Sequence, residues 1–435
     1  MRLKKLLPLI LVMFLVLGIG GAAGYFLGNK NKATDVQPEI AGVSQNKYAL
    51  FLDEVYQTIK ENHWNKMEEP DLLNFFILGA EKLTGQPLNL TEVNKVTWNK
   101  ALLDILDQYD SDEKRKEFSA TLADVVLSNL EPFGRSRLYT QKEEKELSDN
   151  VTNRSGQDRY EALGVDKQAS QSAIDKAFNE KSAEWDPETN DDPEAAEKFA
   201  QIQEAYKVLK DEEARKVYDI SGIEPTMDYK LVNNSTYYVH LTKFSPTTFE
   251  ELNRVMGKLG DRTGVENLIF DLRNNIGGAI DQLPYFLGPF IGMDQYAYQF
   301  FHQGEKVDFK TKVGWMESMV RFKKVVILIN ENSQSTAELM AATLKKYNVG
   351  VLVGTKSKGW GTVERVFPLK QQIADDEKHS MFLVHSLTLR EDGQPIEGKG
   401  VDPVIDIRSK SWEQELYAYY SSNELIEAVR GVIAD

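Results

Sequence analysis

The sequence predicts an α/β core in the C-terminal half of the chain, preceded by a helical region and interrupted by an all-α unit. From Tyr237 onward, short apolar runs alternate with amphipathic stretches, as expected for helices packed on a mostly parallel sheet. Residues 47–148 show the apolar spacing of helices throughout. Residues 157–222 hold two helical stretches joined by a polar turn, which predicts a separate helical hairpin.

Composition narrows the possible functions. The chain has 435 residues, of which 41% are hydrophobic and 27% charged, so it is globular and long enough for two or three domains. Its net charge of −15 argues against a nucleic-acid partner, because phosphate binding needs a basic face. The absence of cysteine excludes disulfides and thiolate chemistry, and the 5 histidines show no paired metal-ligand spacing. We expect neither a metal nor a cofactor.

The first 32 residues resemble a targeting segment. Met1–Lys5 is basic and Leu6–Gly28 carries no charge, which is long enough to cross a bilayer at about 20 residues per span. We therefore expect a single-pass membrane anchor, with the bulk of the chain extracytoplasmic. A cleaved signal peptide is the alternative, because Gly20–Gly24 offers small residues for a peptidase.

The elements of the three units follow in chain order. In the helical cap, Leu52, Val55, Tyr56 and Ile59 fall on one face of a helix. In the second unit, we expect helices at Ala169–Trp185 and Pro193–Leu209 and a short third one at Glu212–Tyr218. In residues 234–435, the expected strands are Tyr237–Leu241, Asn267–Leu272, Val325–Ile329 and Val349–Val353, with helices at Thr248–Leu259 and Ala337–Tyr347.

Two polar turns in the core have the residues of a catalytic site. Gly277 and Gly278 follow a buried strand, where backbone N–H groups can point into a cleft as an oxyanion hole requires. Taken alone, such a glycine pair is better explained by a tight turn. Ser335 precedes a helix, whose N-terminus stabilises negative charge. The spacing of Ser335 and Glu338 also fits a capping box, in which the serine only caps the helix.

Four motifs in order carry a family resemblance. They read DLRNNIGG, NENSQSTAEL, VLVGTKSKGWGTVE and GQPIEGKGVDPVIDI, and together they resemble the C-terminal-processing (tail-specific) serine peptidases. Ser128–Leu147 resembles the region that precedes the PDZ domain of that family. The resemblance implies a ββα-spiral (ClpP/crotonase-like) peptidase core with an α-helical N-terminal cap.

The resemblance also implies the site residues. That family uses a serine–lysine dyad, in which an unprotonated lysine takes the proton of a poorly nucleophilic hydroxyl. Ser335 stands at the nucleophile position, Trp360 at the lysine position and Glu364 at the position of a glutamine that orients the lysine. The oxyanion hole would comprise the N–H of Thr336 and one N–H from the Gly277–Gly278 pair.

Trp360 departs from the family pattern at the position of the catalytic base. An indole N–H donates a hydrogen bond but accepts no proton, so Trp360 cannot act as the base. We expect impaired hydrolysis and a Trp360 ring that fills the cleft beside Ser335. His385, on the expected strand MFLVHSLTL of the same core, and Lys358, two positions before Trp360, are the candidate replacement bases.

The second unit carries a Y-x-x-L-G-V entry, a helix that reads DPEAAEKF, IQEAY and VL, and a YD ending, in that order between Arg159 and Gly222. On these motifs it resembles a DnaJ-type J-domain, and it stands where the family has its PDZ domain. The J-domain's essential HPD tripeptide reads Asp186, Pro187 and Glu188 here, without the histidine. We therefore expect no DnaK-type chaperone as a partner. The helical hairpin would serve protein binding or act as a spacer.

Three functions remain open from the sequence. The first is a hydrolysis-impaired, membrane-anchored protein that binds polypeptide substrates or protein partners outside the cytoplasm. The second is an active serine peptidase that uses Ser335 with a displaced base. The third is a co-chaperone-like module that acts through the J-like unit.

Overall fold

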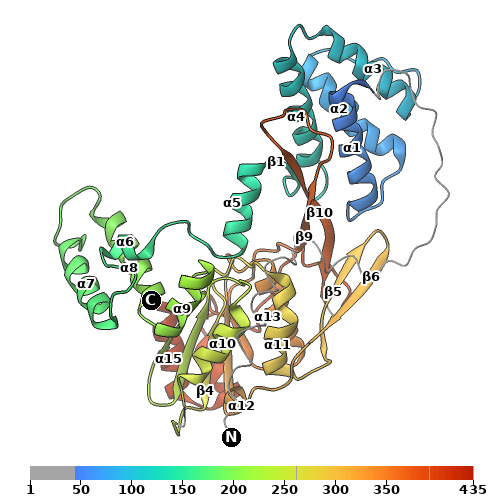
Figure 1. The fold of residues 1–435 in the computed structure, drawn as a ribbon. Coiled ribbons are helices and arrows are strands. Elements are labelled where there is room, and N and C mark those ends of the chain that lie inside the picture. Colours follow the sequence, from blue (N-terminus) through green and yellow to red (C-terminus); the bar gives the residue numbers. More distant parts are fainter. Residues whose placement is uncertain (1–44, 261, 391, 435) are drawn as a thin grey trace, which may run out of the picture.

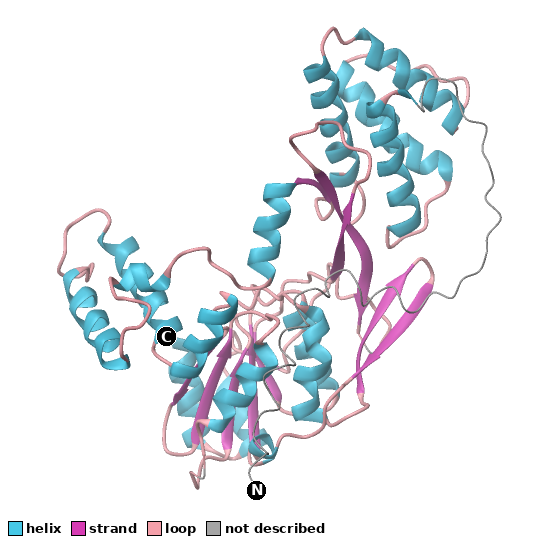
Figure 2. Cartoon of the chain, in the orientation of Figure 1, coloured by secondary structure: helices cyan, strands magenta, loops and turns pink. Residues whose placement is uncertain are grey.

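The computed structural model describes residues 45–260, 262–390 and 392–434, and it has three lobes. The α/β core lies at the bottom of Figure 1, the helical cap at the upper right and the J-like unit at the left. A long ribbon of antiparallel strands joins the cap to the core, as the magenta arrows in Figure 2 show.

The cap is a four-helix unit with its own apolar core. Its helices are α1 (Lys47–Asn62), α2 (Glu69–Thr84), α3 (Lys95–Gln108) and α4 (Asp112–Ser128). Side-chain oxygens of Asn46, Asn94 and Ser111 accept backbone N–H groups at the starts of α1, α3 and α4, which satisfies donors that a helix leaves unpaired. Phe76 and Trp98 are fully buried between the helices.

The connecting ribbon belongs to an antiparallel sheet. Its strands are β1 (Arg137–Thr140), β5 (Tyr296–His302), β6 (Glu305–Lys310), β9 (Thr362–Pro368) and β10 (His379–Leu389). β10 pairs with β9 on one side and with β1 and β5 on the other. Met381 and Leu383 of β10 are buried in the apolar core of the cap. The expectation that MFLVHSLTL runs in the main core is therefore wrong, because this strand extends away from the parallel sheet.

The core is built on a six-stranded sheet of order β11-β8-β7-β4-β3-β2. All neighbouring strands are parallel except the β2–β3 pair. The strands are β2 (Met227–Leu231), β3 (Thr236–Leu241), β4 (Asn267–Asp271), β7 (Lys324–Ile329), β8 (Val351–Gly354) and β11 (Ile405–Asp406). The predicted α/β architecture is confirmed, and the four expected strands lie within about two residues of β3, β4, β7 and β8.

Helices cover both faces of this sheet. Along β7, Val325, Ile327 and Ile329 pack on one face, and Val326 and Leu328 pack on the other, because successive side chains of a strand point in opposite directions. The first face carries α10 (Thr248–Gly257), α11 (Leu283–Ile291), α12 (Glu317–Val320) and α13 (Thr336–Lys346); the second carries α14 (Trp412–Tyr420) and α15 (Asn423–Ala434).

The J-like unit follows α5 (Gln141–Val151) and docks on the core through ion pairs from its last two helices. It comprises α6 (Arg159–Leu163), α7 (Gln171–Glu184), α8 (Ala195–Leu209) and α9 (Glu212–Ser221), with a small apolar core of its own. The two expected long helices correspond to α7 and α8. Asp211 at the start of α9 pairs with Arg254 on α10 and with Lys258, the residue that follows α10.

The expected membrane anchor at Leu6–Gly28 lies outside the described residues. Among residues 45–434 that the structure describes, no helix combines the length and apolar character of a membrane span.

Candidate active site

Ser335 lies on the turn between β7 and α13 in a strained backbone conformation. Its φ is 57° and its ψ is −123°, a region that residues other than glycine rarely adopt. Strain of this kind costs about 1–3 kcal/mol and persists only where surrounding contacts enforce it. Ser335 immediately precedes the first residue of α13, so its hydroxyl lies at the positive end of the helix dipole.

The glycine pair packs directly against the Ser335 turn. A Cβ placed on Gly277 would come within 2.6 Å of the Ser335 Cβ and 3.0 Å of its Oγ. A Cβ on Gly278 would lie 2.1 Å from the carbonyl oxygen of Phe244. Both positions need glycine because backbone approaches on both sides leave no room for a side chain.

Two backbone donors remain free beside Ser335. The Gly277 N–H donates to Asn275 Oδ1 at 2.8 Å, and Asn275 Nδ2 in turn donates to the Leu241 carbonyl. Neither the N–H of Gly278 nor that of Thr336 has a hydrogen-bond partner among the described residues. Of the glycine pair, Gly278 is therefore the one with a donor available for an oxyanion, together with Thr336.

A buried carboxylate joins the Ser335 turn to the Trp360 loop. Glu338 Oε2 accepts the N–H of Ser335 at 2.9 Å and that of Trp360 at 2.8 Å. Its Oε1 accepts the N–H of Gly359 at 2.7 Å and the hydroxyl of Ser357 at 2.5 Å. Burial raises the pKa of Glu338, although these four donors act in the opposite direction. Hydrogen bonds to Glu338 thus fix the backbone both at Ser335, the nucleophile position, and at Trp360, the lysine position.

The Trp360 ring is engaged by charged side chains. The Arg135 guanidinium lies 3.4 Å from the ring centroid, and Lys358 Nζ lies 5.3 Å from it. The indole N–H points to Glu364 Oε1 at 3.4 Å, and burial raises the pKa of this carboxyl. We expected the ring to pack beside Ser335; the backbone of Trp360 is held there through Glu338, whereas the ring contacts Arg135, Lys358 and Glu364.

The two candidate replacement bases lie in different settings. His385 stacks on His302 with 4.1 Å between ring centroids, and its Nδ1 lies 2.8 Å from the neighbouring Ser386 hydroxyl. Burial, followed by the charge of Arg365, lowers the pKa of His385 to about 3, which makes it a weak base. Lys358 is exposed and its backbone N–H donates to the Ser333 carbonyl at 3.0 Å. No described contact links either side chain to Ser335.

The altered HPD tripeptide forms the turn after α7. Asp186, Pro187 and Glu188 follow Trp185, and Asp186 Oδ1 accepts the Glu188 N–H at 3.0 Å. Asp186 thus holds its own turn where the J-domain family has a histidine.

Sequence reasoning missed three residues that shape the site, Asn275, Arg135 and Glu397, and gave a fourth, Glu338, only a role in helix capping. Asn275 and Glu338 orient backbone groups, and their position within the recognised motifs was the available signal. Arg135 and Glu397 form a 3.0 Å ion pair beside Trp360 although 262 positions separate them in the chain. No local pattern predicts that pairing.

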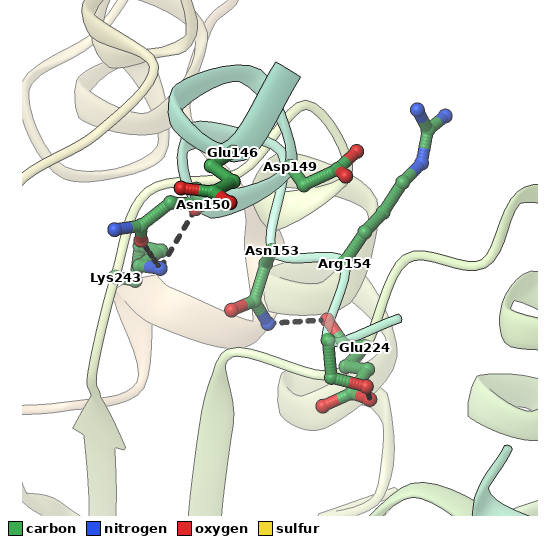
Figure 3. Close-up of a pocket in the computed structure, with 8 residues that line it drawn as sticks. Glu146, Asp149, Asn150, Asn153, Arg154, Glu224 and Lys243 are labelled. Carbon is green, nitrogen blue, oxygen red and sulfur yellow. Dashed lines mark hydrogen bonds between the residues drawn. The ribbon is translucent and has the colours of Figure 1, made fainter. Parts of the chain in front are cut away.

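A hollow lies at the base of the J-like unit, where α5 meets the core (Figure 3). Its lining residues are Glu146, Asp149, Asn150, Asn153, Arg154, Ser155, Glu224 and Lys243. None of them belongs to the Ser335 site. Lys243 donates to Asn150, and Asn153 donates to the Glu224 carbonyl, so polar contacts already connect its walls.

Comparison with known proteins places two domains in this chain. Residues 235–407 match peptidase family S41, and this stretch includes Ser335 and Trp360. They form a peptidase family S41 domain. Residues 158–219 match the DnaJ domain, so the J-like unit is also confirmed.

Individual relatives each cover less than half of this chain. A probable CtpA-like serine protease of Staphylococcus epidermidis is 28% identical over 173 residues, which is 40% of this chain and 34% of that protein. The chaperone protein DnaJ of Haloarcula marismortui is 50% identical over 68 residues, 16% of this chain and 18% of that protein. The chain thus spans well under half of these relatives.

Among solved structures, the photosystem II D1 C-terminal processing protease aligns with a TM-score of 0.49 at 13% identity. The alignment covers 83% of this chain and 93% of that one.

Proposed function

We propose that this protein is a hydrolysis-impaired relative of the C-terminal-processing peptidases that binds polypeptides without cleaving them efficiently. The observation that carries the proposal is Trp360 at the lysine position. Its ring contacts the Arg135 guanidinium, and its N–H donates to Glu364. An indole accepts no proton, so the Ser335 hydroxyl has no general base in the place where the family has one. Loss of one member of such a catalytic unit typically costs roughly 10⁴-fold or more in rate.

The remaining parts of the site support binding. The S41 domain keeps the free N–H groups of Gly278 and Thr336, which can hold a carbonyl oxygen of a bound chain. The relatives named as proteases act on polypeptides, and this chain shares their domain. We place the protein at the outer face of a bacterial membrane, anchored through Leu6–Gly28, with the J-like unit as a protein-binding hairpin or spacer.

Active-site labelling with a fluorophosphonate tests the proposal. The Ser335 oxygen would attack phosphorus, fluoride would leave, and the hydroxyl proton would pass to a base. We expect labelling of the full chain to be indistinguishable from that of Ser335→Ala. Rapid labelling that Ser335→Ala abolishes would contradict the proposal and favour an active peptidase.

Lys358 is the residue that would rescue activity, because its backbone contacts Ser333 and its amine lies near Trp360. If the protein labels rapidly, loss of labelling in Lys358→Ala would assign the base, and Lys356→Ala is the matched control two positions away.

A co-chaperone function requires that the full chain stimulate the ATPase of a DnaK-type chaperone. We expect no stimulation, because Asp186 replaces the histidine.

A further inference from the structure

One edge of β9 is open. Among the described strands, β9 pairs with β10 alone, whereas β1 and β5 pair with the other side of β10. A strand at the edge of a sheet presents a row of backbone N–H and C=O groups with which another extended chain can pair. Pro368, the last residue of β9, has no N–H, so this open edge is short and covers residues 362–366.

The open edge faces the Ser335 turn. The Gly361 carbonyl accepts the N–H of Thr388 on β10 at 2.8 Å, so Gly361 and every second residue after it bond to β10. The intervening residues direct their backbone groups to the open side. Trp360 does the same, because its N–H donates to the Glu338 oxygen that also accepts the N–H of Ser335. A chain paired with this edge would therefore run past Ser335.

An apolar stripe lies along the same edge. Met381 and Leu383 point into the core of the cap, so Phe382 between them points to the opposite face of the ribbon. Val366 lies directly opposite Phe382 in the β9–β10 pair, and the Tyr139 ring stacks on Phe382 with 5.3 Å between ring centroids. We call Tyr139, Phe382 and Val366 the ribbon stripe. All three are half-buried, and none of them belongs to the apolar cores of the cap, the J-like unit or the parallel sheet.

We propose that the polypeptide bound by this protein adds to the open edge of β9 as an extended strand, with every second side chain on the ribbon stripe. This inference rests on the proposed function, and it specifies where the bound chain lies and which conformation it adopts. Main-chain hydrogen bonds supply affinity in such a pairing, and pockets for alternate side chains supply selectivity. The occupant is therefore an unfolded segment that has apolar residues at alternate positions.

A second copy of this chain suits the edge less well. The net charge of −15 repels another copy, and the exposed Arg365 and Pro368 are residues that protect an edge strand from pairing with its like. An unfolded segment needs only a few residues to use so short an edge.

The first test measures peptide binding to the full chain by fluorescence anisotropy. The probe is a fluorescein-labelled peptide in which valine alternates with threonine between terminal lysines. Two further versions carry N-methyl groups, one on the central valine nitrogens and the other on the central threonine nitrogens. Only one of these two sets faces the neighbouring strand when the peptide is an added strand. We expect one version to bind at least about tenfold more weakly than the unmethylated peptide, and the other to bind within about threefold of it.

Equal effects of the two N-methylated versions would overturn the proposal, because a peptide bound by its side chains alone has no such alternation. A peptide that does not bind at all would instead contradict the proposed function. The two failures are thus distinguishable.

The second test changes the protein. Val366→Pro removes an N–H on the open side and spares the bonds to β10, so it should weaken peptide binding by about tenfold. Val366→Ala keeps the N–H but shortens the ribbon stripe, and it should weaken binding several-fold. Val363→Ala is the matched control, because Val363 is also a half-buried valine of β9 but points to the opposite face. It should leave the affinity unchanged, and a loss equal to that of Val366→Ala would overturn the role of the stripe.

Two further measurements complete the test. Amide hydrogen exchange of β10 shows whether the ribbon of each variant is folded, and the N-methylated peptides test the proposal on the unmodified chain in any case. Sedimentation velocity detects the competing occupant. A dimer of the full chain that Val366→Pro dissociates would place a second copy on the edge and overturn the proposal.

Discussion

Ser335 and Trp360 are connected by one carboxylate, although 25 positions of chain separate them. Glu338 accepts their two N–H groups on a single oxygen and two further donors on the other. Each donor fixes one backbone position, so the strained φ of Ser335 and the path of the Trp360 loop depend on the same buried group. The glycines around Trp360 have a related cause: a Cβ on Gly361 would lie 2.2 Å from the Glu397 nitrogen.

Replacing Glu338 by glutamine should loosen both segments. The amide NH₂ would face N–H or O–H donors where an oxygen now accepts two of them, which leaves buried donors unpaired. We expect a loss of about 2–3 kcal/mol in the free energy of unfolding. Urea unfolding measures the loss, and amide hydrogen exchange should accelerate at residues 335–339 and 357–361.

Glu331→Gln is the control for this prediction. Glu331 is exposed and accepts only the hydroxyl of Thr355 at 2.7 Å, close to the same loop. We expect its replacement to change stability by less than about 1 kcal/mol. If the two variants behaved alike, Glu338 would not hold the two segments together.

One residue, Asp211, both caps helix α9 and contacts the S41 domain. Asp211 caps this helix by accepting the N–H groups of Glu213 and Ala214, and the same carboxylate pairs with Arg254 of α10 and with Lys258, which follows α10. Although burial acts to raise its pKa, the hydrogen bonds from Lys258 and Ala214 and the charge of Arg254 lower it from 3.8 to about 2. The J-like unit is thus attached to the S41 domain by an ionised group.

Acid should release this attachment. Because the folded-state pKa of Asp211 is below its unfolded value, its stabilisation is complete above about pH 4 and is lost as pH falls toward about 2. The lowered pKa of Asp211 corresponds to about 2 kcal/mol of stabilisation of the folded state above this pH window. Hydrogen exchange of the full chain should show protection in residues 211–221 falling across that window.

Asp211→Asn should remove this pH dependence and lower protection already at neutral pH. Asp166→Asn is the control, because Asp166 is exposed and its carboxylate accepts, among the described residues, only the nearby N–H of Gln168. An Asp211→Asn variant that retained the acid transition would show that another group attaches the unit.

At the scale of the whole molecule, the cap is stabilised by a strand that arrives from the S41 domain. Met381 and Leu383 of β10 are fully buried among the cap helices, and Leu369 and Ile373 join them. Trp64 donates its backbone N–H to Val384, which ties the end of the cap to the same strand. The cap core is therefore completed only when residues 369–383 pack against the helices of residues 47–128.

Truncating Leu383 should destabilise the cap selectively. Leu383→Ala removes a fully buried side chain and should cost about 2–5 kcal/mol, measured as hydrogen-exchange protection of α1–α4. Leu425→Ala is the matched control, because Leu425 is equally buried but packs between α15 and the parallel sheet. It should lower protection of the sheet and leave the cap unchanged. Loss of protection in both lobes from either change would mean that they unfold as one unit.

The sequence alone determined the parts of this protein whose causes are local. Alternating apolar runs fixed β3, β4, β7 and β8, helical spacing fixed α7 and α8, and the motifs located Ser335, Trp360 and the altered HPD tripeptide. These features depend on side-chain periodicity and on residue identities at short spacing.

Only the tertiary structure decided what surrounds Trp360. It brings Arg135 from the cap and Glu397 from the last glycine-rich turn to the same loop, and it carries the strand of His385 out into the ribbon beside His302. Such contacts join residues that are distant in sequence, and they arise from the packing of whole elements. For that reason the sequence could show that the lysine is replaced, but not what holds its replacement in position.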